Sequence, residues 1–519
     1  MGLNSRKHSN ILWNANLHAT NTEGVIRKSS IIGTIGPKSQ PVEVMVKLIN
    51  AGLNIVRMNF SHGSHEFHKQ TIDNARKAAA LANGNQLIAI ALDTKGPEIR
   101  TGKIRPDIPE PTFEAGHEMI FSTDSKFEEI GDLEVLYIDY PNLWKVVKPG
   151  RTIYIDDGIM EFTVLETSEN TVKVRAVNSG TLAERKGVNL PGSIIDLPPL
   201  SKKDEGDLKF AVENGLDMVF ASFIRCADDV RHIREYLGEE GKNIKIISKI
   251  ESTQGVENFD DILEVSDGIM IARGDLGIEI PAAQVFLYQK SMIAKSNILG
   301  KPVICATQML ESMTYNPRPT RAEVSDVANA IIDGADCVML SGETAKGIYP
   351  IEAVKIMSQI AILAESSICQ HSTYSDLRDI IPLPVGTTEA TCSSAVNAVC
   401  ELNAKLIICL SVSGTSARML SKYRPSVPIV VLTRYPYTAR NAHLSRGCYP
   451  VIYTKEKPVL TGDTAADREV WQMDVDARVQ FAIDHAISRG LVSHGDLVVT
   501  VQGWRGGVGN TNTIRVLCA

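Results

Sequence analysis

Eight short apolar runs, separated by segments with helical signals, constrain the fold of this chain more than any other feature. Runs of this kind are typical of buried parallel strands, and parallel strands are joined by helical crossovers. Eight such units predict a closed (β/α)₈ barrel, the TIM-barrel form of the α/β class. The runs are Ser30–Ile35, Asn54–Met58, Leu87–Leu92, Asp217–Ala221, Ile244–Ile250, Gly268–Ile271, Pro302–Ala306 and Asp336–Leu340.

Residues 98–199, between the third and fourth runs, have a different pattern. Asp156-Asp157-Gly158 separates two alternating segments, 151–155 and 159–164, which is a hairpin signal. A further alternating segment follows at 171–177. We expect a small all-β domain of β-barrel type, inserted in the loop after the third barrel strand. At that position it can act as a mobile lid.

From about residue 371 a third pattern begins. Strand-like runs alternate with helical segments there, which predicts an open-sheet α/β domain. The runs are Leu406–Leu410, Ile429–Leu432, Val451–Tyr453 and Leu497–Val501, and one helix is expected at Val475–Arg489. The predicted division is an N-terminal segment 1–29, a barrel 30–97 and 200–370, the lid 98–199 and a C-terminal domain 371–519.

Composition narrows the class of protein and its partners. The chain has 519 residues, 44% of them hydrophobic and 22% charged, which is ordinary for a globular enzyme with more than one core. The net charge of −7 and the lack of a basic block argue against nucleic acid or an anionic membrane as a partner. The first 29 residues are polar, without the apolar core of a signal peptide. Nine cysteines with no C-x-x-C pair are expected to be reduced, as in the cytoplasm, with Cys305, Cys337 and Cys409 in the core.

Polar residues gather where the predicted barrel strands end. They follow five of the runs, at 34–38, 57–63, 93–100, 306–308 and 341–344. The active sites of (β/α)₈ barrels lie at the carboxyl ends of the strands. We therefore expect one site built from many strand ends.

Lys249, Glu251 and Asp275 are the most informative members of this set. Lys249 and Glu251 are two residues apart in a strand and so face the same side. A cation beside two carboxylates suits a divalent metal and a phosphate-bearing substrate. A buried Lys–Glu pair that only fixes packing remains the alternative. The chain has neither G-x-x-x-x-G-K-[ST] nor an H-R-D loop, so phosphate must be bound by dispersed Arg and Lys residues and metal.

Several long segments resemble the pyruvate kinase family, and the similarity covers nearly all of the chain beyond residue 28. They are Ile31–Pro37, Asn54–Gly63, Ala91–Arg100, Lys186–Gly192, Ile247–Glu251, Ala272–Ile280, Ile304–Ser312 and Leu340–Lys346. The resemblance implies the last step of glycolysis, in which phosphoenolpyruvate transfers its phosphoryl group to ADP and gives pyruvate and ATP.

The resemblance also implies roles for single residues. Lys249 and Arg57 would offset the charge of the phosphoryl group. Backbone N–H groups at Gly274 and Asp275, at a helix start, would bind the substrate carboxylate. Thr307 would lie near the enolate carbon that must be protonated, with a water chain through Thr307 as the expected route.

Two cation sites and a nucleotide site follow from the same resemblance. Glu251 and Asp275 would hold Mg²⁺ or Mn²⁺. The family's K⁺ site corresponds to Asn59, Ser61, Asp93 and Thr94. A glutamate at position 98 supports a K⁺ requirement, since relatives with lysine there supply their own cation. The nucleotide would contact Asn59, His62, Arg100 and Lys186.

The C-terminal domain is implied to be regulatory. A loop with successive N–H groups and hydroxyls can form an anion nest, and similar loops in the family bind the activator fructose 1,6-bisphosphate. The corresponding residues are Ser411, Ser413, Gly414, Thr415, Ser416, Trp471, Arg478 and Gly503. A plain serine-rich turn is the alternative. The resemblance further implies a cytoplasmic homotetramer.

Two other functions remain open from the residues alone. Lys249 could form a Schiff base as in barrel aldolases, although a lysine beside metal-binding carboxylates should be charged rather than a free amine. The second open function is that of a metabolite sensor without catalytic activity. His62, His65 and His68 are spaced three apart, and we expect them on a helix surface rather than around a metal.

Overall fold

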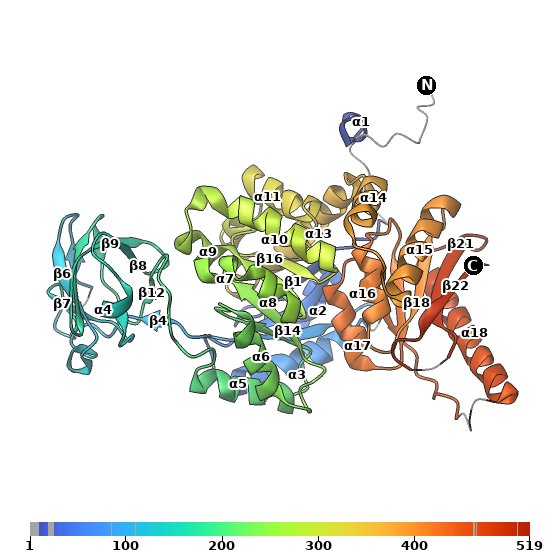
Figure 1. Ribbon diagram of the computed structural model, residues 1–519, viewed down its shortest axis with the longest axis horizontal. Helices are drawn as coiled ribbons and strands as arrows, with labels where there is room; N and C mark the ends of the chain where they lie inside the picture. The colour runs from blue at the N-terminus through green and yellow to red at the C-terminus, as the bar shows by residue number, and fades with distance from the viewer. Residues whose placement is uncertain are drawn as a thin grey trace.

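The computed structural model describes residues 10–18, 25–84, 86–108, 110–459, 462, 464–505 and 507–519. Its main parts lie in a row, with an all-β lid on the left of Figure 1, a barrel in the centre and an α/β domain on the right. The predicted N-terminal segment 1–29 is described only in part and contains α1 (Asn10–Ala15). Within the described ranges, no helix has the length and apolarity needed to cross a bilayer.

The eight predicted barrel strands are confirmed, and they form a closed parallel barrel. Their spatial order is β1-β17-β16-β15-β14-β13-β3-β2. Their bounds are β1 Ser30–Thr34, β2 Leu53–Asn59, β3 Ala89–Asp93, β13 Met218–Ala221, β14 Lys245–Ile250, β15 Gly268–Ala272, β16 Val303–Ala306 and β17 Cys337–Leu340.

Helices surround this barrel, and their ends carry recognisable start and stop signals. The Thr320–Glu323 capping box begins α11, and Gly300, with φ 65°, ends α10. The barrel helices are α2 Val42–Ala51, α3 His65–Leu81, α5 Lys202–Glu213, α6 Ala227–Leu237, α7 Thr253–Glu257, α8 Phe259–Val265, α9 Arg273–Glu279, α10 Val285–Leu299, α11 Arg321–Ile332, α12 Gly342–Ala345 and α13 Pro350–Ser366, with 3₁₀ turns Ala282–Gln284 and Glu311–Thr314.

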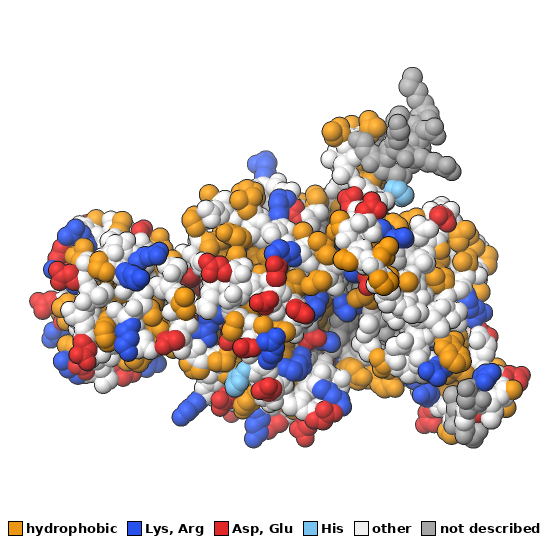
Figure 2. Space-filling view, viewed as in Figure 1, with side chains coloured by type: hydrophobic (Ala, Val, Ile, Leu, Met, Phe, Trp, Pro, Cys, Tyr) orange, Lys and Arg blue, Asp and Glu red, His pale blue; other side chains and the backbone are white. Residues whose placement is uncertain are grey.

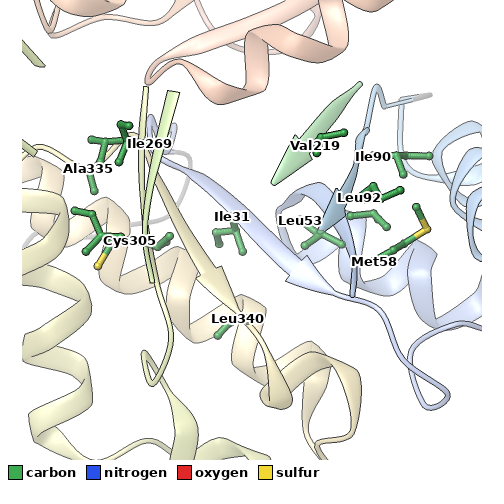
Figure 3. Packing of buried hydrophobic residues seen from close by; sticks show 14 of the residues in the cluster. Ile31, Leu53, Met58, Ile90, Leu92, Val219, Ile269, Cys305, Ala335 and Leu340 are labelled. Carbon is green, nitrogen blue, oxygen red and sulfur yellow. The ribbon is translucent and has the colours of Figure 1, made fainter. Parts of the chain in front are cut away.

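Successive side chains along each barrel strand point alternately into the barrel and out toward the helices, so the apolar residues form two layers. One layer fills the barrel and includes Ile32, Phe220 and Met270. The other packs between strands and helices, where Figure 3 shows Ile31 and Leu340 among its members. Because the interior is filled with side chains, the barrel is a solid support and the polar strand ends are left for the site.

The lid is all-β, as predicted. Its main sheet has the order β4-β12-β8-β9-β10-β6-β7, beside a two-stranded sheet of β11 and β5. Backbone bonds also join the two edges, since Asp139 N donates to Arg100 O at 3.0 Å and Gly102 N donates to Tyr137 O at 2.8 Å, which gives the small barrel form. The elements are β4 Ile99–Arg100, β5 Thr112–Phe113, β6 Glu118–Ser122, β7 Val135–Tyr137, β8 Thr152–Ile155, β9 Met160–Ser168, β10 Thr171–Ala176, β11 Gly180–Thr181 and β12 Gly187–Asn189, with α4 Leu143–Val146 and a 3₁₀ turn Ser125–Phe127.

The C-terminal domain has an open five-stranded sheet of order β20-β19-β18-β21-β22. Its strands are parallel except β22, which is antiparallel to β21. The expected helix 475–489 is wrong at its start, because α18 begins ten residues earlier, at Ala465, after a capping box of Thr464 and Asp467. The elements are α14 Gln370–Ile380, α15 Thr387–Leu402, β18 Leu406–Leu410, α16 Thr415–Lys422, β19 Ile429–Thr433, α17 Pro436–Asn441, the 3₁₀ turn Ala442–Leu444, β20 Cys448–Ile452, α18 Ala465–Ser488, β21 Leu497–Gly503 and β22 Thr511–Cys518.

This domain packs against the amino ends of the barrel strands. Arg440 Nε lies 2.6 Å from Asp217 Oδ1, just before β13, and Leu444 joins the apolar floor inside the barrel. The carboxyl ends of the strands therefore remain available to the lid. On the face shown in Figure 2, acidic and basic side chains are interspersed over lid and barrel rather than gathered by sign.

Candidate active site

A cavity of about 440 Å³ lies at the carboxyl ends of the barrel strands, with walls from both the barrel and the lid. Its size suits a small-molecule site. Its walls include most of the residues that the sequence singled out, namely Arg57, Asn59, Ser61, His62, Asp93, Glu98, Arg100, Lys186, Lys249, Glu251 and Asp275.

Lys249 occupies the floor of this cavity, on β14. Its Nζ lies 3.0 Å from Asp93 Oδ1 and 3.0 Å from Glu251 Oε1, and the side chain is largely buried. Burial alone would lower the pKa of Lys249, but the two carboxylates outweigh burial and raise it. Lys249 is therefore a fixed cation, which argues against the free amine that a Schiff base requires.

Arg57 and Asp93 extend the charge network. Arg57 Nε lies 2.6 Å from Asp93 Oδ2, and Nη1 donates to Thr34 Oγ at 2.8 Å. Burial alone would raise the pKa of Asp93, but Arg57 and Lys249 lower it. The floor thus carries Arg57 and Lys249 on either side of the ionised Asp93 carboxylate, with Glu251 as the second acidic partner of Lys249.

Glu251 and Asp275 form the acidic side of the cavity. Phe223 N donates to Glu251 Oε2 at 2.7 Å. Burial raises the pKa of Glu251, and burial together with the charge of Glu251 raises the pKa of Asp275 to about 7. Two carboxylates that repel one another in a shielded place suit a divalent cation. Among the described residues no group of three His, Cys, Asp or Glu side chains forms a metal cage, so other ligands would come from substrate and water.

Thr307 and Gly274 lie together beside this acidic pair but are not among the cavity's lining residues. Thr307 follows β16 with φ +74°, and Arg273 Nη2 donates to its carbonyl at 2.8 Å. A Cβ on Gly274 would lie 2.9 Å from Thr307 Cγ2, so only glycine permits this approach. The first turn of α9 is thereby held against Thr307.

The residues expected to bind K⁺ lie together at the ends of β2 and β3. Asn59, Ser61 and Asp93 line the cavity, and Asn59 Oδ1 accepts from Ser61 N at 3.1 Å. Thr94 is buried behind them, where its Oγ accepts from Ser222 N at 3.0 Å. Its carbonyl also accepts from Ser222, from Oγ at 2.6 Å, and a carbonyl oxygen has a second lone pair that can face a cation.

The residues expected to bind nucleotide line the outer part of the cavity. Arg100 Nε donates to Glu98 Oε2 at 2.7 Å, and Lys186 Nζ lies 2.9 Å from Asp156 Oδ1. Both cations are partly exposed. Arg100 lies on β4 and Lys186 directly precedes β12, and these two lid strands are paired, so the lid carries both cations to the cavity together.

Sequence reasoning missed the loop after β13. Ser222 accepts from Lys249, Phe223 donates to Glu251, and Arg225 donates to the carbonyls of Ile195 and Leu197 in the chain returning from the lid. Its only sequence signal was its position after an apolar run.

The histidine expectation was wrong in part. His68 is buried and stacks on Phe60 with ring centroids 3.9 Å apart, while His65 Nε2 lies 2.7 Å from Asp207. His62 lines the active cavity. The three rings do not share an exposed helix face.

A second cavity, of about 110 Å³, lies in the C-terminal domain. It is lined by Ser411, Ser413, Thr415, Ser416, Trp471, Arg478 and Gly503, while Gly414 lies at the adjacent helix start with φ 85°. Trp471 Nε1, Arg478 Nη2 and Gln502 Oε1 are buried without a hydrogen-bond partner in the described part of the chain. Such atoms are costly unless a ligand satisfies them.

Cations that face paired carboxylates in a shielded cavity suit phosphoryl transfer, which depends on charge compensation and positioning. The comparisons with known proteins agree with this class, and the chain is a phosphotransferase enzyme.

Family comparisons then define the protein more narrowly. The pyruvate kinase barrel domain matches residues 26–354, and the pyruvate kinase alpha/beta domain matches residues 389–517. The chain is 58% identical to pyruvate kinase 2 of Candida glabrata over 492 residues, covering 95% of this chain and 94% of that protein. It is 58% identical to pyruvate kinase 1 of Saccharomyces cerevisiae over 492 residues, covering 95% and 96%. It is 56% identical to pyruvate kinase of Candida albicans over 514 residues, covering 99% and 100%. The chain belongs to the pyruvate kinase family.

Proposed function

We propose that the enzyme transfers the phosphoryl group of phosphoenolpyruvate to ADP, giving pyruvate and ATP. The observation that carries this proposal is the fixed positive charge of Lys249 and Arg57 on the floor of a cavity that also presents Glu251 and Asp275. In this reaction the bond between the enol oxygen and phosphorus breaks, a bond from phosphorus to the terminal ADP oxygen forms, and the enolate carbon takes a proton.

The residues divide this work between charge compensation and proton delivery. Lys249 and Arg57 offset charge on the phosphoryl oxygens, and backbone N–H groups of Gly274 and Asp275 bind the substrate carboxylate. The proton reaches the enolate carbon through water ordered by Thr307. Glu251 and Asp275 fit Mg²⁺ or Mn²⁺, which when bound supplies positive charge to the phosphoryl and enolate oxygens.

Asn59, Ser61, Asp93 and the Thr94 carbonyl are proposed to hold K⁺. We predict that Glu98→Lys weakens the dependence of kcat on K⁺, because a lysine there brings a cation to the same wall. The test is a K⁺ titration of kcat for both proteins, with tetramethylammonium as the counter-ion. An unaltered titration would remove Glu98 from this role.

The nucleotide phosphates are proposed to lie between Arg100 and Lys186, with Asn59 and His62 beside them. Both cations already have acidic partners beside them, Glu98 for Arg100 and Asp156 for Lys186. When a nucleotide binds, its phosphate oxygens would replace Glu98 and Asp156 as partners of Arg100 and Lys186. Because the nucleotide also contacts the barrel, this would draw the lid toward the barrel.

Fructose 1,6-bisphosphate is proposed as an activator at the C-terminal cavity. The buried, unpartnered Arg478 Nη2 and Trp471 Nε1 support an anionic, hydroxyl-bearing ligand there. The assay compares activity at low phosphoenolpyruvate with and without the sugar bisphosphate. Loss of its effect in Arg478→Ala, with activity at high phosphoenolpyruvate retained, is expected.

The assembly, location and domain limits remain predictions. We propose a cytoplasmic homotetramer, which light scattering of the purified protein would test. The limits 98 and 199 of the lid are proposed hinge positions, which limited proteolysis would locate.

Formation of ATP by the purified enzyme tests the main proposal. The assay supplies phosphoenolpyruvate, ADP, Mg²⁺ and K⁺, and activity should be lost on removal of the divalent cation by chelation. Absence of ATP formation would favour a metabolite sensor instead. Borohydride trapping of a keto acid on Lys249 would favour a Schiff-base aldolase.

A further inference from the structure

Every N–H of the Lys249 ammonium is already engaged. An ammonium has three donors, and they face Asp93 Oδ1 at 3.0 Å, Glu251 Oε1 at 3.0 Å and Ser222 Oγ at 2.7 Å. Ser222 is the nearest of these partners and the only one without charge. It is 4% exposed, so water does not compete for the bond.

Ser222 is fixed to Thr94 from two sides. Its backbone N–H donates to Thr94 Oγ at 3.0 Å, and its Oγ donates to the Thr94 carbonyl at 2.6 Å. The same hydroxyl also lies within hydrogen-bond distance of Asp93 Oδ1, at 3.2 Å, and we assign its single proton to the shorter contact, with Thr94 O. The lone pairs of Ser222 Oγ then face Lys249.

The backbone of Gly96 approaches this serine closely. A Cβ added to Gly96, which has φ +72°, would lie 2.8 Å from Ser222 Cβ. The glycine at position 96, two residues after Thr94, therefore keeps the space next to the β-carbon of Ser222 open. The direction of its hydroxyl is set by its hydrogen bonds to Thr94 and Lys249.

The partners of Lys249 differ in what else they must bind. Glu251 and Asp93 are both proposed metal ligands, so a bound cation competes with Lys249 for their oxygens. Ser222 is not in that competition. A carbonyl oxygen has two lone pairs, so the Thr94 oxygen can accept from Ser222 and still face a cation.

We propose that Ser222 is a positioning residue that couples the Lys249 ammonium to the monovalent-cation site through the Thr94 carbonyl. It holds Lys249 when metals occupy the two carboxylates, and it sets the direction of the carbonyl that K⁺ would meet. The inference rests on the proposed function, because it assigns Lys249 and Thr94 the roles given above.

The test uses Ser222→Ala and Ser222→Cys with a matched control. Cysteine is close to serine in size, but its sulfur is a weak hydrogen-bond partner, so this variant removes the bond while keeping the packing. The control is Ser248→Ala. Ser248 precedes Lys249 on β14, is fully buried, and shares a hydrogen bond of 2.6 Å with Ser266 away from the cavity.

Two measurements separate positioning from folding. The first is kcat and its half-saturating K⁺ concentration at saturating substrates and Mg²⁺. The second is the rise in melting temperature caused by K⁺ in chelator-treated protein without substrates, since a ligand that binds the folded state stabilises it. Both Ser222 variants should lose about tenfold or more in kcat and need about threefold more K⁺, while Ser248→Ala stays within about twofold. Their K⁺-induced rise in melting temperature should also shrink.

Equal behaviour of the Ser222 variants and Ser248→Ala in both measurements would overturn the inference. So would a lower melting temperature in the Ser222 variants with kcat and the K⁺ response kept, because that marks a purely structural serine. Failure of the proposed function would look different. The wild-type protein would then form no ATP, while the melting experiment would still report whether Ser222 and the K⁺ response are linked.

Discussion

At the scale of single residues, the site depends on keeping a buried lysine charged. Lys249 achieves this because Asp93 and Glu251 flank it, and Arg57 supports Asp93 from its other side. Buried charges are costly unless paired, so each member of the network stabilises the charge state of the next. A change at one position will therefore alter the others.

Lys249→Met should abolish turnover and also affect stability. We expect kcat to fall by at least about 10³-fold, because transition-state charge loses a fixed donor. The methionine keeps an aliphatic stem, but Asp93 and Glu251 lose their shared cation. The loss of stability should be below the roughly 3–5 kcal/mol of a broken buried pair, since Arg57 still neutralises Asp93. Steady-state kinetics and calorimetry with and without Mg²⁺ check both expectations, and an unchanged kcat would refute the role of Lys249.

The sequence predicted charged residues at strand ends better than the polar residues that orient them. Lys249 and Glu251 could be placed from the two-residue period of a strand alone. Ser222 and Arg225 could not, because their partners are backbone carbonyls distant in the sequence, that of Thr94 for Ser222 and that of Leu197 for Arg225. His68 was expected on the surface of α3 but is buried against Phe60. The helical period alone does not show which face of α3 packs against the barrel.

At the scale of elements, the short helix α9 connects the acidic pair with the lid. Asp275 lies in its first turn and Glu279 at its end. A Cβ on Gly158, in the lid hairpin, would lie 3.5 Å from Ile278 Cγ1, and Asn189 and Leu190 of the lid lie close to the Glu279 carboxylate. The lid therefore rests on the helix that carries Asp275.

Glu279→Gln should change how stability depends on pH. Burial raises the pKa of Glu279 to about 7. The folded state thus holds a proton that the unfolded state releases at lower pH, so this stabilisation is full below the unfolded pKa and is lost as pH rises through about 7. Melting temperatures of metal-free protein between pH 5 and 8 should fall less steeply in the variant. Parallel curves for the two proteins would show that Glu279 does not titrate in this range.

The starts of helices can be predicted from the sequence where a capping residue precedes an apolar pattern. A capping box is such a signal, as at Thr320 and Glu323, where it marks the start of α11 in the sequence itself. The same kind of signal at Thr464 and Asp467 begins α18, but it was overlooked because the flanking residues are polar. β22 was missed because its alternation is weak and its pairing with β21 is a tertiary contact.

At the scale of the whole molecule, the barrel separates two sites. The active cavity lies at the carboxyl ends of the strands, and the C-terminal domain closes the amino ends. We call the contact between the amino ends of the barrel strands and the C-terminal domain the seam. Arg424 Nη1 lies 2.6 Å from Asp336 Oδ1 across it, with both side chains buried. If the proposed activator binds in the C-terminal cavity, its effect on the active site would have to cross this polar seam.

His443 makes this seam sensitive to acid. It is 7% exposed, and its Nε2 donates to the Leu87 carbonyl, at the start of the barrel, at 3.0 Å. Burial lowers its pKa to about 4, so the folded protein keeps the ring neutral. The unfolded chain takes up the proton near its ordinary pKa of about 6.5. Stability from this group is therefore present above about pH 6.5 and is lost as pH falls toward 4.

His443→Gln should reduce this loss, because glutamine can donate to Leu87 but does not titrate. Between pH 6.5 and 4.5 the melting temperature of the variant should fall less than that of the wild type. His494→Gln, at an exposed histidine, is the matched control and should follow the wild type. If the melting temperatures of all three proteins fall in parallel as the pH is lowered, protonation of His443 is not the cause of the loss of stability. A difference confined to His443→Gln would instead locate the acid response at the contact through which the C-terminal domain holds the barrel.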